Sequence, residues 1–236
     1  MYLAIETSSD TASLVLAEEG EILAELNWRC AQSHTTTLLP NLDNLLKQSG
    51  LDLTAITAVI VSQGPGSYNG LRVGISTAKA LAFSLNIPVV GIDSLEALAY
   101  QHAEAGLPVC AIVNAGRNEI AAAIYQMKEP EFREILGTSI ITLADLCQGI
   151  DTKTIFCGEI TAPMADEIGG MLGEVAVIPS PAASVRRAAF LVELGYQRIE
   201  SGRLDTPAGL APIYLRKPHI TKPNRNKKTM VVSNGD

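Results

Sequence analysis

Short apolar runs and one leucine series with helical spacing alternate along the first half of the chain. Residues 2–6 and 12–17 are apolar runs joined by a polar turn, and a third run at 22–28 follows an acidic turn. This pattern predicts an antiparallel meander of three strands. The period then changes, because leucines recur on one helix face before a serine-glycine stop, at Leu38, Leu39, Leu42, Leu45 and Leu46.

Alternating elements continue to about residue 106. The pattern predicts a strand at 58–61, a helix at 71–85, a strand at 89–91, and a helix that is capped by Asp93 or Ser94 and ends near Ala103. A meander followed by alternating helices and strands is typical of an α/β lobe with a mixed sheet. The first lobe is therefore expected at residues 1–106.

A second unit begins near residue 107. The pattern predicts paired strands at 109–113 and 120–125 around a turn at 114–116, a strand at 154–157, and a long helix at 184–201 capped by Ser184. The chain is irregular beyond 207, and its polar, basic composition from 218 onward predicts disorder. We expect a second lobe at 107–216, weakly similar to the first because both start with antiparallel strands, and a tail at 217–236.

Composition narrows the class of protein. Of the 236 residues, 47% are hydrophobic but only 5% are aromatic, so the core is expected to consist of aliphatic side chains. No apolar run reaches the roughly 20 residues of a membrane-spanning helix, and the first run is predicted as a strand rather than a signal peptide. The four cysteines form no C-x-x-C pair, which favours buried free thiols in a reducing cytoplasm.

Charge is distributed unevenly. The net charge is −7, yet residues 216–236 hold six basic residues and one acidic residue, a balance of +5 that leaves −12 on residues 1–215. An acidic body does not attract nucleic acid by itself, so the tail is the candidate for contact with a polyanion.

The most informative segment is a glycine-rich loop at 63–74, between a predicted buried strand and a predicted helix. Backbone N–H groups at such a helix start can hold an anion. The loop lacks the lysine and hydroxyl residue of a Walker loop, so a tight connection without a ligand is an equal alternative. The candidate loop residues are Gly64, Pro65, Gly66, Ser67, Gly70 and Arg72.

Small residues recur at i, i+4 spacing along the helix that follows the loop, at Gly70, Gly74, Ala78 and Ala82. Such a stripe allows another element to approach closely. The spacing alone leaves open whether that element is the protein's own sheet or a helix of a partner.

The sequence contains no recognisable set of catalytic residues. Ser67 has no identifiable base, and the three histidines, His34, His102 and His219, lie far apart in the chain. Glu6 could approach a phosphate-bound metal, although a hydrogen-bonded carboxylate at the strand end is favoured. His34 suits capping or an interface contact better than catalysis. We predict no catalytic residue, no metal and no cofactor.

Four motifs, in chain order, carry a family resemblance. Residues 1–8 with Ser13 resemble the "LAIDTS" opening of TsaB (YeaZ) proteins, and residues 64–74 resemble their "GPGSFTGLRVG" signature, with Tyr-Asn in place of Phe-Thr. Residues 33–34 and 212–216 resemble the step before the first helix and the "PxYLR" end of the same proteins. The sequence is thus similar to the TsaB family over residues 1–216.

The resemblance implies the fold shared by acetate and sugar kinases, heat-shock chaperones and actin (the ASKHA fold), an α/β architecture with two related lobes. It also implies a non-catalytic, cytoplasmic subunit that binds TsaD as a heterodimer, reaches TsaE through the complex, forms a homodimer when alone, and meets tRNA only through the complex. That complex transfers a threonylcarbamoyl group from threonylcarbamoyl-AMP to the adenosine 3′ of the anticodon. No membrane contact is implied.

In this family the helices of the N-terminal lobe contact TsaD and form the competing homodimer. The resemblance therefore favours the intermolecular interpretation of the small-residue stripe. The expected interface residues are Leu38, Leu42, Leu45, Gly70, Gly74, Ala78 and Ala82.

Two positions separate the chain from the catalytic paralogue. TsaD carries an H-x-E-G-H pair of metal ligands after a strand similar to residues 88–91, where this chain reads Ser94-Leu95-Glu96-Ala97-Leu98. One carboxylate without either histidine cannot complete a metal site, so TsaD-type transfer is not expected.

Alternatives remain open at this level. The loop and Glu6 also suit a nucleotide-binding or nucleotide-hydrolysing enzyme of the ASKHA superfamily, and a peptidase is the least favoured reading. Residues 114–121 depart from the family's "DARxxEVY" segment. The basic tail is either a contact for tRNA phosphates or a solubilising extension.

Overall fold

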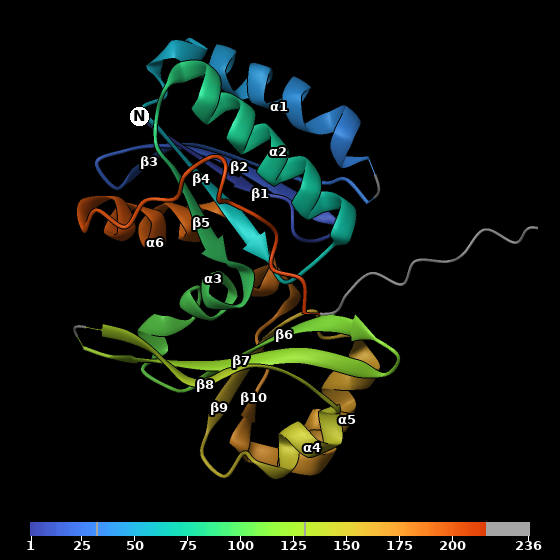
Figure 1. Ribbon diagram of the computed structural model, residues 1–236. Coiled ribbons are helices and arrows are strands. Elements are labelled where there is room, and N and C mark those ends of the chain that lie inside the picture. The colour runs from blue at the N-terminus through green and yellow to red at the C-terminus, as the bar shows by residue number, and fades with distance from the viewer. Residues whose placement is uncertain (32, 130, 216–236) are drawn as a thin grey trace, which may run out of the picture.

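The computed structural model in Figure 1 describes residues 1–31, 33–129 and 131–215 and contains two stacked α/β lobes. In the first sheet, β1 (Tyr2–Glu6), β2 (Thr11–Glu18) and β3 (Glu21–Arg29) form the expected antiparallel meander, and β4 (Ala58–Gly64) and β5 (Val89–Asp93) add in parallel. The strand order is β3-β2-β1-β4-β5. Helices α1 (His34–Gln48) and α2 (Tyr68–Leu85) cover its outer face.

The second sheet repeats this plan. Its meander consists of β6 (Val109–Gly116), β7 (Glu119–Lys128) and β8 (Glu131–Ile141), and β9 (Thr154–Gly158) and β10 (Ala176–Val177) add in parallel beside β6. The order β8-β7-β6-β9-β10 matches that of the first sheet. Helices α4 (Leu143–Gln148) and α5 (Ala162–Leu172) pack on one face of the sheet. The expected similarity of the two halves is confirmed.

The third helix of each lobe packs between the two sheets. Helix α6 (Ala188–Glu200) lies on the first sheet, where Leu191 and Val192 join the core formed by β1, β4 and β5. Helix α3 (Ser94–Tyr100) lies mainly on the second sheet, where Leu95 and Leu98 pack against β6 and β7. The second lobe expected at 107–216 therefore includes one helix, α6, that packs on the first sheet.

The last described residues form a strap that returns to the first lobe. Asp205 bridges to Val89, its carboxylate accepts the Gly91 N–H at 2.8 Å, and Lys79 donates to the Leu210 carbonyl at 3.1 Å. The Ile213 N–H then bonds the Gln63 carbonyl at 2.8 Å. The strap thus passes from β5 to the glycine-rich loop (Figure 1). The tail at 217–236 lies outside the described residues.

Two sequence-based element boundaries are wrong. The helix predicted at 184–201 begins at Ala188, because Arg187 is its extended N-cap and Pro181–Ser184 form a separate 3-10 turn. The hairpin turn lies at Arg117 and Asn118 rather than at 114–116, because both of these residues have positive φ and the strands continue to them. Three further 3-10 turns lie at Leu53–Ala55, Ala103–Ala105 and Gly173–Val175. No helix in the described ranges is long and apolar enough to span a bilayer.

The small-residue stripe on α2 packs against the end of β1 and the turn that follows it. A Cβ on Gly70 would lie 2.0 Å from the Thr7 carbonyl oxygen, and a Cβ on Gly74 would lie 2.1 Å from the Thr7 Oγ1. The expected interface set is buried within the chain, at Leu38, Leu42, Leu45, Gly70, Gly74, Ala78 and Ala82. The intermolecular interpretation of these seven residues is therefore wrong, because their side chains or Cα atoms fill the core under α1 and α2.

Replacing Gly70 by alanine should destabilise the protein by about 3 kcal/mol or more, since the added methyl group meets backbone rather than a movable side chain. Gly169→Ala on α5 is the matched control, because no atom lies within 4 Å of its added Cβ. That control should stabilise the protein by about 0.5–1 kcal/mol. Urea unfolding measures both; equal stability of the two variants would contradict the packing described for Thr7.

Candidate functional site

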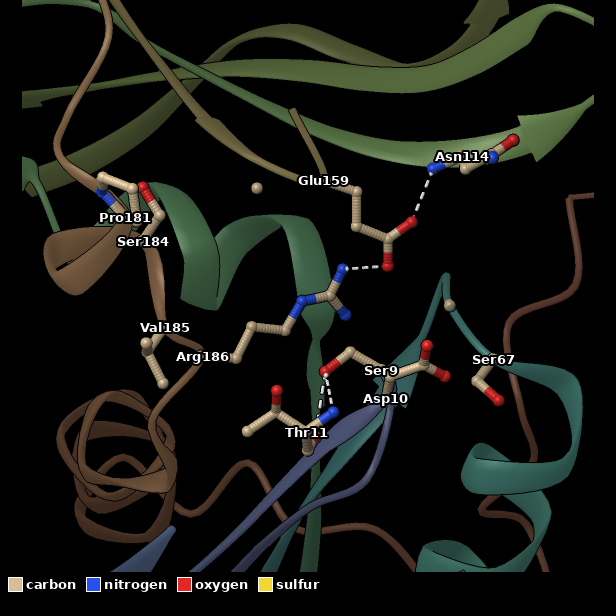
Figure 2. A pocket seen from close by; sticks show the side chains of 12 residues that line it. Ser9, Asp10, Thr11, Ser67, Asn114, Glu159, Pro181, Ser184, Val185 and Arg186 are labelled. Carbon is tan, nitrogen blue, oxygen red and sulfur yellow. Dashed lines mark hydrogen bonds and ion pairs between the residues drawn. The ribbon is translucent and has the colours of Figure 1, made fainter. Parts of the chain in front are cut away.

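A cleft of about 490 Å³ lies between the two lobes. Its first-lobe wall is the β1–β2 turn at Ser9, Asp10 and Thr11 together with the glycine-rich loop at Gly66 and Ser67. Its other wall comes from the second lobe and from the segment before α6, at Asn114, Gly158, Glu159, Pro181, Ser184, Val185 and Arg186 (Figure 2). The cleft is thus the place where both lobes present polar groups to one another.

Arg186 crosses this cleft and ties the lobes together. Its buried guanidinium donates to the Ser8 Oγ at 2.5 Å and to the Ser8 carbonyl at 3.2 Å in the first lobe. On the other side it donates to the Glu159 carboxylate at 2.8 Å, and the second oxygen of Glu159 accepts the Asn114 N–H at 2.9 Å. Figure 2 shows Arg186 pointing toward Glu159. A charge-assisted network therefore occupies the middle of the cleft.

Sequence reasoning missed Arg186. The available signal was an arginine pair directly before an apolar helix, at Arg186 and Arg187. The two arginines lie in different environments: Arg187 is at the protein surface and pairs with Glu25, whereas Arg186 is buried. Only the three-dimensional position of the β1–β2 turn distinguishes the two.

The glycine-rich loop is shaped by close packing on the same turn. A Cβ on Gly66 would lie 2.2 Å from the Ser8 carbonyl oxygen, which also accepts the Ser67 N–H at 2.7 Å. The Ser67 hydroxyl accepts the Gly70 N–H at 3.3 Å and caps α2, and the Gly64 N–H donates to the Ser94 Oγ at 3.1 Å. These contacts account for the loop as a tight connection, the alternative that the sequence left open.

The candidate loop residues are not gathered at one place. Gly66 and Ser67 line the cleft, whereas Pro65 lines a second cavity nearer the strap. Arg72 lies one turn into α2, is exposed, and donates to the Tyr68 hydroxyl at 2.9 Å.

Glu6 and His34 hold the β1–β2 turn in place. The buried Glu6 carboxylate accepts the Ser8 N–H at 2.5 Å, in line with the hydrogen-bonded strand-end carboxylate that the sequence favoured. The buried His34 ring bonds the Ser9 carbonyl through Nε2 at 2.9 Å. Neither side chain lines the large cleft. His102 lies at a distant 3-10 turn, and His219 lies outside the described residues.

At the junction of β5 and α3, the side chains are buried or paired within the protein. Ser94 and Leu98 are buried, and Leu98 joins the core of the second lobe. Glu96 pairs with Arg198 at 2.5 Å. Within the described part of the chain, no group of three His, Cys, Asp or Glu side chains is close enough to hold a metal ion.

Asp93 is the most perturbed acidic group at this step. Its carboxylate caps α3 by accepting the Leu95 N–H at 2.7 Å and the Glu96 N–H at 3.1 Å. Burial nevertheless raises its pKa to about 6, and the nearby Glu96 and Glu134 act in the same direction. The ionised carboxylate is thus disfavoured in the folded protein.

Removing the Arg186 guanidinium should cost about 2 kcal/mol, because Glu159 and the Ser8 carbonyl lose a buried donor while Glu159 keeps partial access to water. Arg186→Met tests this. Arg187→Met is the matched control and should cost under about 1 kcal/mol, since its ion pair is more exposed. Thermal and urea unfolding should rank the variants in this order; the reverse order would contradict the clamp.

Asp93→Asn should become relatively more stable than the parent protein as pH rises. The folded pKa of Asp93 lies above its ordinary value of 3.8, so its favourable contribution is complete below that value and is lost as pH rises through about 6. Asparagine keeps an acceptor for α3, so the two proteins should match near pH 4 and differ by on the order of 1–3 kcal/mol near pH 8. Urea unfolding across this range measures the difference, with exposed Asp43→Asn as control.

The chain is similar in sequence to proteins of tRNA threonylcarbamoyladenosine synthesis. The family model for TsaD, tRNA N6-adenosine threonylcarbamoyltransferase, matches residues 28–185. The TsaB protein of Bacillus subtilis is 30% identical over 217 residues, covering 91% of this chain and 93% of that protein. The TsaB protein of Haemophilus influenzae is 34% identical over 161 residues, covering 68% of this chain and 64% of that protein.

Solved structures agree on the fold. YeaZ from Pseudomonas aeruginosa superposes with a TM-score of 0.75 at 24% identity, over 90% of this chain and 99% of that one. A second structure, described as a protein with similarity to peptidase YeaZ from Pseudomonas aeruginosa, gives 0.78 at 25% identity over 91% and 99%. The match to the B. subtilis protein over 91% of this chain, the two-lobed fold and the loop at 64–74 converge: the chain belongs to the TsaB family of tRNA threonylcarbamoyladenosine biosynthesis proteins.

Proposed function

We propose that this protein serves tRNA threonylcarbamoyladenosine synthesis as a non-catalytic cytoplasmic subunit that binds TsaD, reaches TsaE through that complex, and forms a homodimer when alone. The observation that carries the proposal is the outer face of α2. Over 18 residues this helix has two charged side chains, Arg72 and Lys79, and Lys79 is bonded to the strap. Its exposed face holds Ser76, Ala80 and Phe83, and the Phe83 side chain is 83% exposed.

Such a surface suits a helix of another protein. Depletion of charge and a large exposed aromatic side chain distinguish interface cores from ordinary surface. Ser76 and Ala80 allow a partner helix to approach closely. Helix α1 forms the same outer layer beside α2 in Figure 1, and its Leu39 side chain is 55% exposed. The interface is thus proposed on the outward side of both helices, not on the buried residues named from sequence.

The non-catalytic role is supported by the β5–α3 step and by the cleft. Ser94 and Leu98 stand where the TsaD pattern has histidines, and both pack inside the protein. The nucleotide-hydrolysing alternative requires several free acidic groups to hold a phosphate-bound metal at the cleft. Of the described residues that line the cleft, only Asp10 and Glu159 are acidic; Glu159 pairs with Arg186, and Glu6 is buried in the β1–β2 turn. Isothermal titration with ATP and magnesium separates the two functions.

Phe83→Glu should abolish co-elution with TsaD from the same organism, because a carboxylate would be desolvated at the centre of the interface. Loss of at least tenfold in affinity is expected, on the order of 1.4 kcal/mol or more. In a reconstituted system, modified adenosine should form only when TsaD and this chain are both present, and Phe83→Glu should reduce it in parallel.

Met171→Glu on α5 is the matched control, since Met171 is an apolar helix residue that is 50% exposed on the second lobe. Both variants should melt with the parent protein. Unchanged co-elution of Phe83→Glu, or modification by this chain without TsaD, would refute the proposal.

A further inference from the structure

A cavity of about 370 Å³ lies where α6, α3 and the start of β8 meet. It shares no lining residue with the cleft at Arg186. Figure 1 shows α3 between α6 and the second sheet. The volume falls within the roughly 300–1,000 Å³ of small-molecule pockets. The walls of this cavity include Glu96, Glu131, Phe132, Leu194, Arg198 and Arg203.

The described lining residues carry two positive and two negative side chains. Arg198 and Arg203 come from the end of α6 and the turn after it, whereas Glu96 comes from α3 and Glu131 from β8. The charges balance, and the two signs stand on different elements. This arrangement favours a ligand that carries both charges, because a purely anionic or cationic ligand would meet a group of its own sign.

Two of these four groups are held by the fold. Arg198 donates to the Gly91 carbonyl at 2.5 Å and to the Glu96 carboxylate at 2.5 Å. The Arg198 and Glu96 side chains are only 26% and 23% exposed. This pair connects α6 with β5 and α3, so it forms a fixed wall of the cavity.

The other two groups keep capacity for a ligand. Among the described residues, the Arg203 guanidinium donates only through Nε, to the Ser201 Oγ at 2.9 Å. Glu131 pairs with Arg133 through Oε2 at 2.7 Å, and both side chains of that pair are 60% exposed. Exposed pairs of this kind contribute little to stability. Glu131 can therefore exchange Arg133 for the ammonium group of a ligand at small cost.

Apolar side chains complete the cavity. The Phe132 ring is stacked on Tyr125, with centroids 5.4 Å apart at an interplanar angle of 10°, and lies edge-on to Tyr100 at 5.2 Å. Leu194 of α6 is 4% exposed and belongs to the core on the first sheet. Because the fold already fixes these side chains, packing against a ligand costs them little conformational entropy.

We propose that this cavity binds a free α-amino acid with an apolar side chain. The carboxylate pairs with Arg203, the ammonium pairs with Glu131, and the side chain packs on Phe132 and Leu194. The ligand class follows from one cation and one anion with capacity to spare beside two apolar side chains. This inference goes beyond TsaD binding and does not depend on it, because the isolated chain carries every group involved.

An NMR titration of the isotopically labelled, full-length isolated chain with L-phenylalanine and L-leucine tests the proposal. Saturable binding of both is expected, with a dissociation constant of about 1 mM or lower. Two analogues of L-phenylalanine separate the charges, because hydrocinnamate lacks the ammonium and phenethylamine lacks the carboxylate. Each should bind about tenfold more weakly than L-phenylalanine, since each leaves one charged group of the cavity without its partner.

Arg203→Gln and Glu131→Gln should each weaken binding of L-phenylalanine by about tenfold. The losses should be selective. Arg203→Gln should not weaken binding of phenethylamine, which has no carboxylate, and Glu131→Gln should not weaken binding of hydrocinnamate, which has no ammonium.

Arg133→Gln is the matched control. It breaks the same ion pair as Glu131→Gln and removes an exposed arginine, yet Arg133 does not line the cavity. This variant should bind L-phenylalanine at least as well as the parent protein. A loss confined to Glu131→Gln therefore reports on the ligand contact rather than on the surface ion pair.

Three results would overturn the proposal. One is the absence of saturable binding of both amino acids. Another is binding that Arg203→Gln and Glu131→Gln leave unchanged, which would place the ligand elsewhere on the protein. The third is hydrocinnamate bound as tightly as L-phenylalanine, which would make the cavity a site for anions. Co-elution with TsaD is a separate measurement, so failure here leaves the proposed function to its own test.

Discussion

The first lobe depends on the close packing of the glycine-rich loop and α2 against the buried turn after β1. The Thr7 and Ser8 backbone carbonyls lie inside the protein, where each must find a donor or be closely covered. The Ser8 carbonyl receives the Ser67 N–H and the Arg186 guanidinium, and the Thr7 side chain donates to the Gly70 carbonyl. Only glycine leaves room for backbone this close. The glycine-rich motif is thus a consequence of how α2 approaches the turn, with no ligand required.

The same turn determines how the two lobes are joined. Through Arg186, Ser8 is linked to Glu159 in the second lobe, and the packing of α3 and α6 between the sheets adds an apolar connection. The strap adds a third connection, because it is bonded to β4 and β5 while its Leu215 packs against the core of the second lobe. An arrangement held at three places suits a subunit that presents fixed surfaces, because movement of the lobes would break all three together.

Much of this fold was predictable from local pattern. The opening meander, α1, α2, β4, β5 and the start of β6 follow from apolar periodicity, and the Asp93 cap follows from its position before the third helix. The start of α6 was not predictable, because Ala188 donates its N–H to the Ser13 Oγ, a residue 175 positions away. The stripe on α2 had the right periodicity, but period alone cannot tell a helix that packs on Thr7 from one that packs on a partner. Arg186 was missed for the same reason, since its partners are distant in sequence.

Helix α2 carries exposed aromatic side chains at both of its ends. Tyr68 begins α2 and Phe83 lies near its end, and a rise of 1.5 Å per residue separates them by roughly 22 Å. A partner seated over Phe83, as proposed, would therefore lie at the opposite end of α2 from the glycine-rich loop and the cleft. An 18-residue helix packed firmly on the first sheet thus keeps the proposed TsaD contact at a fixed distance from the glycine-rich loop.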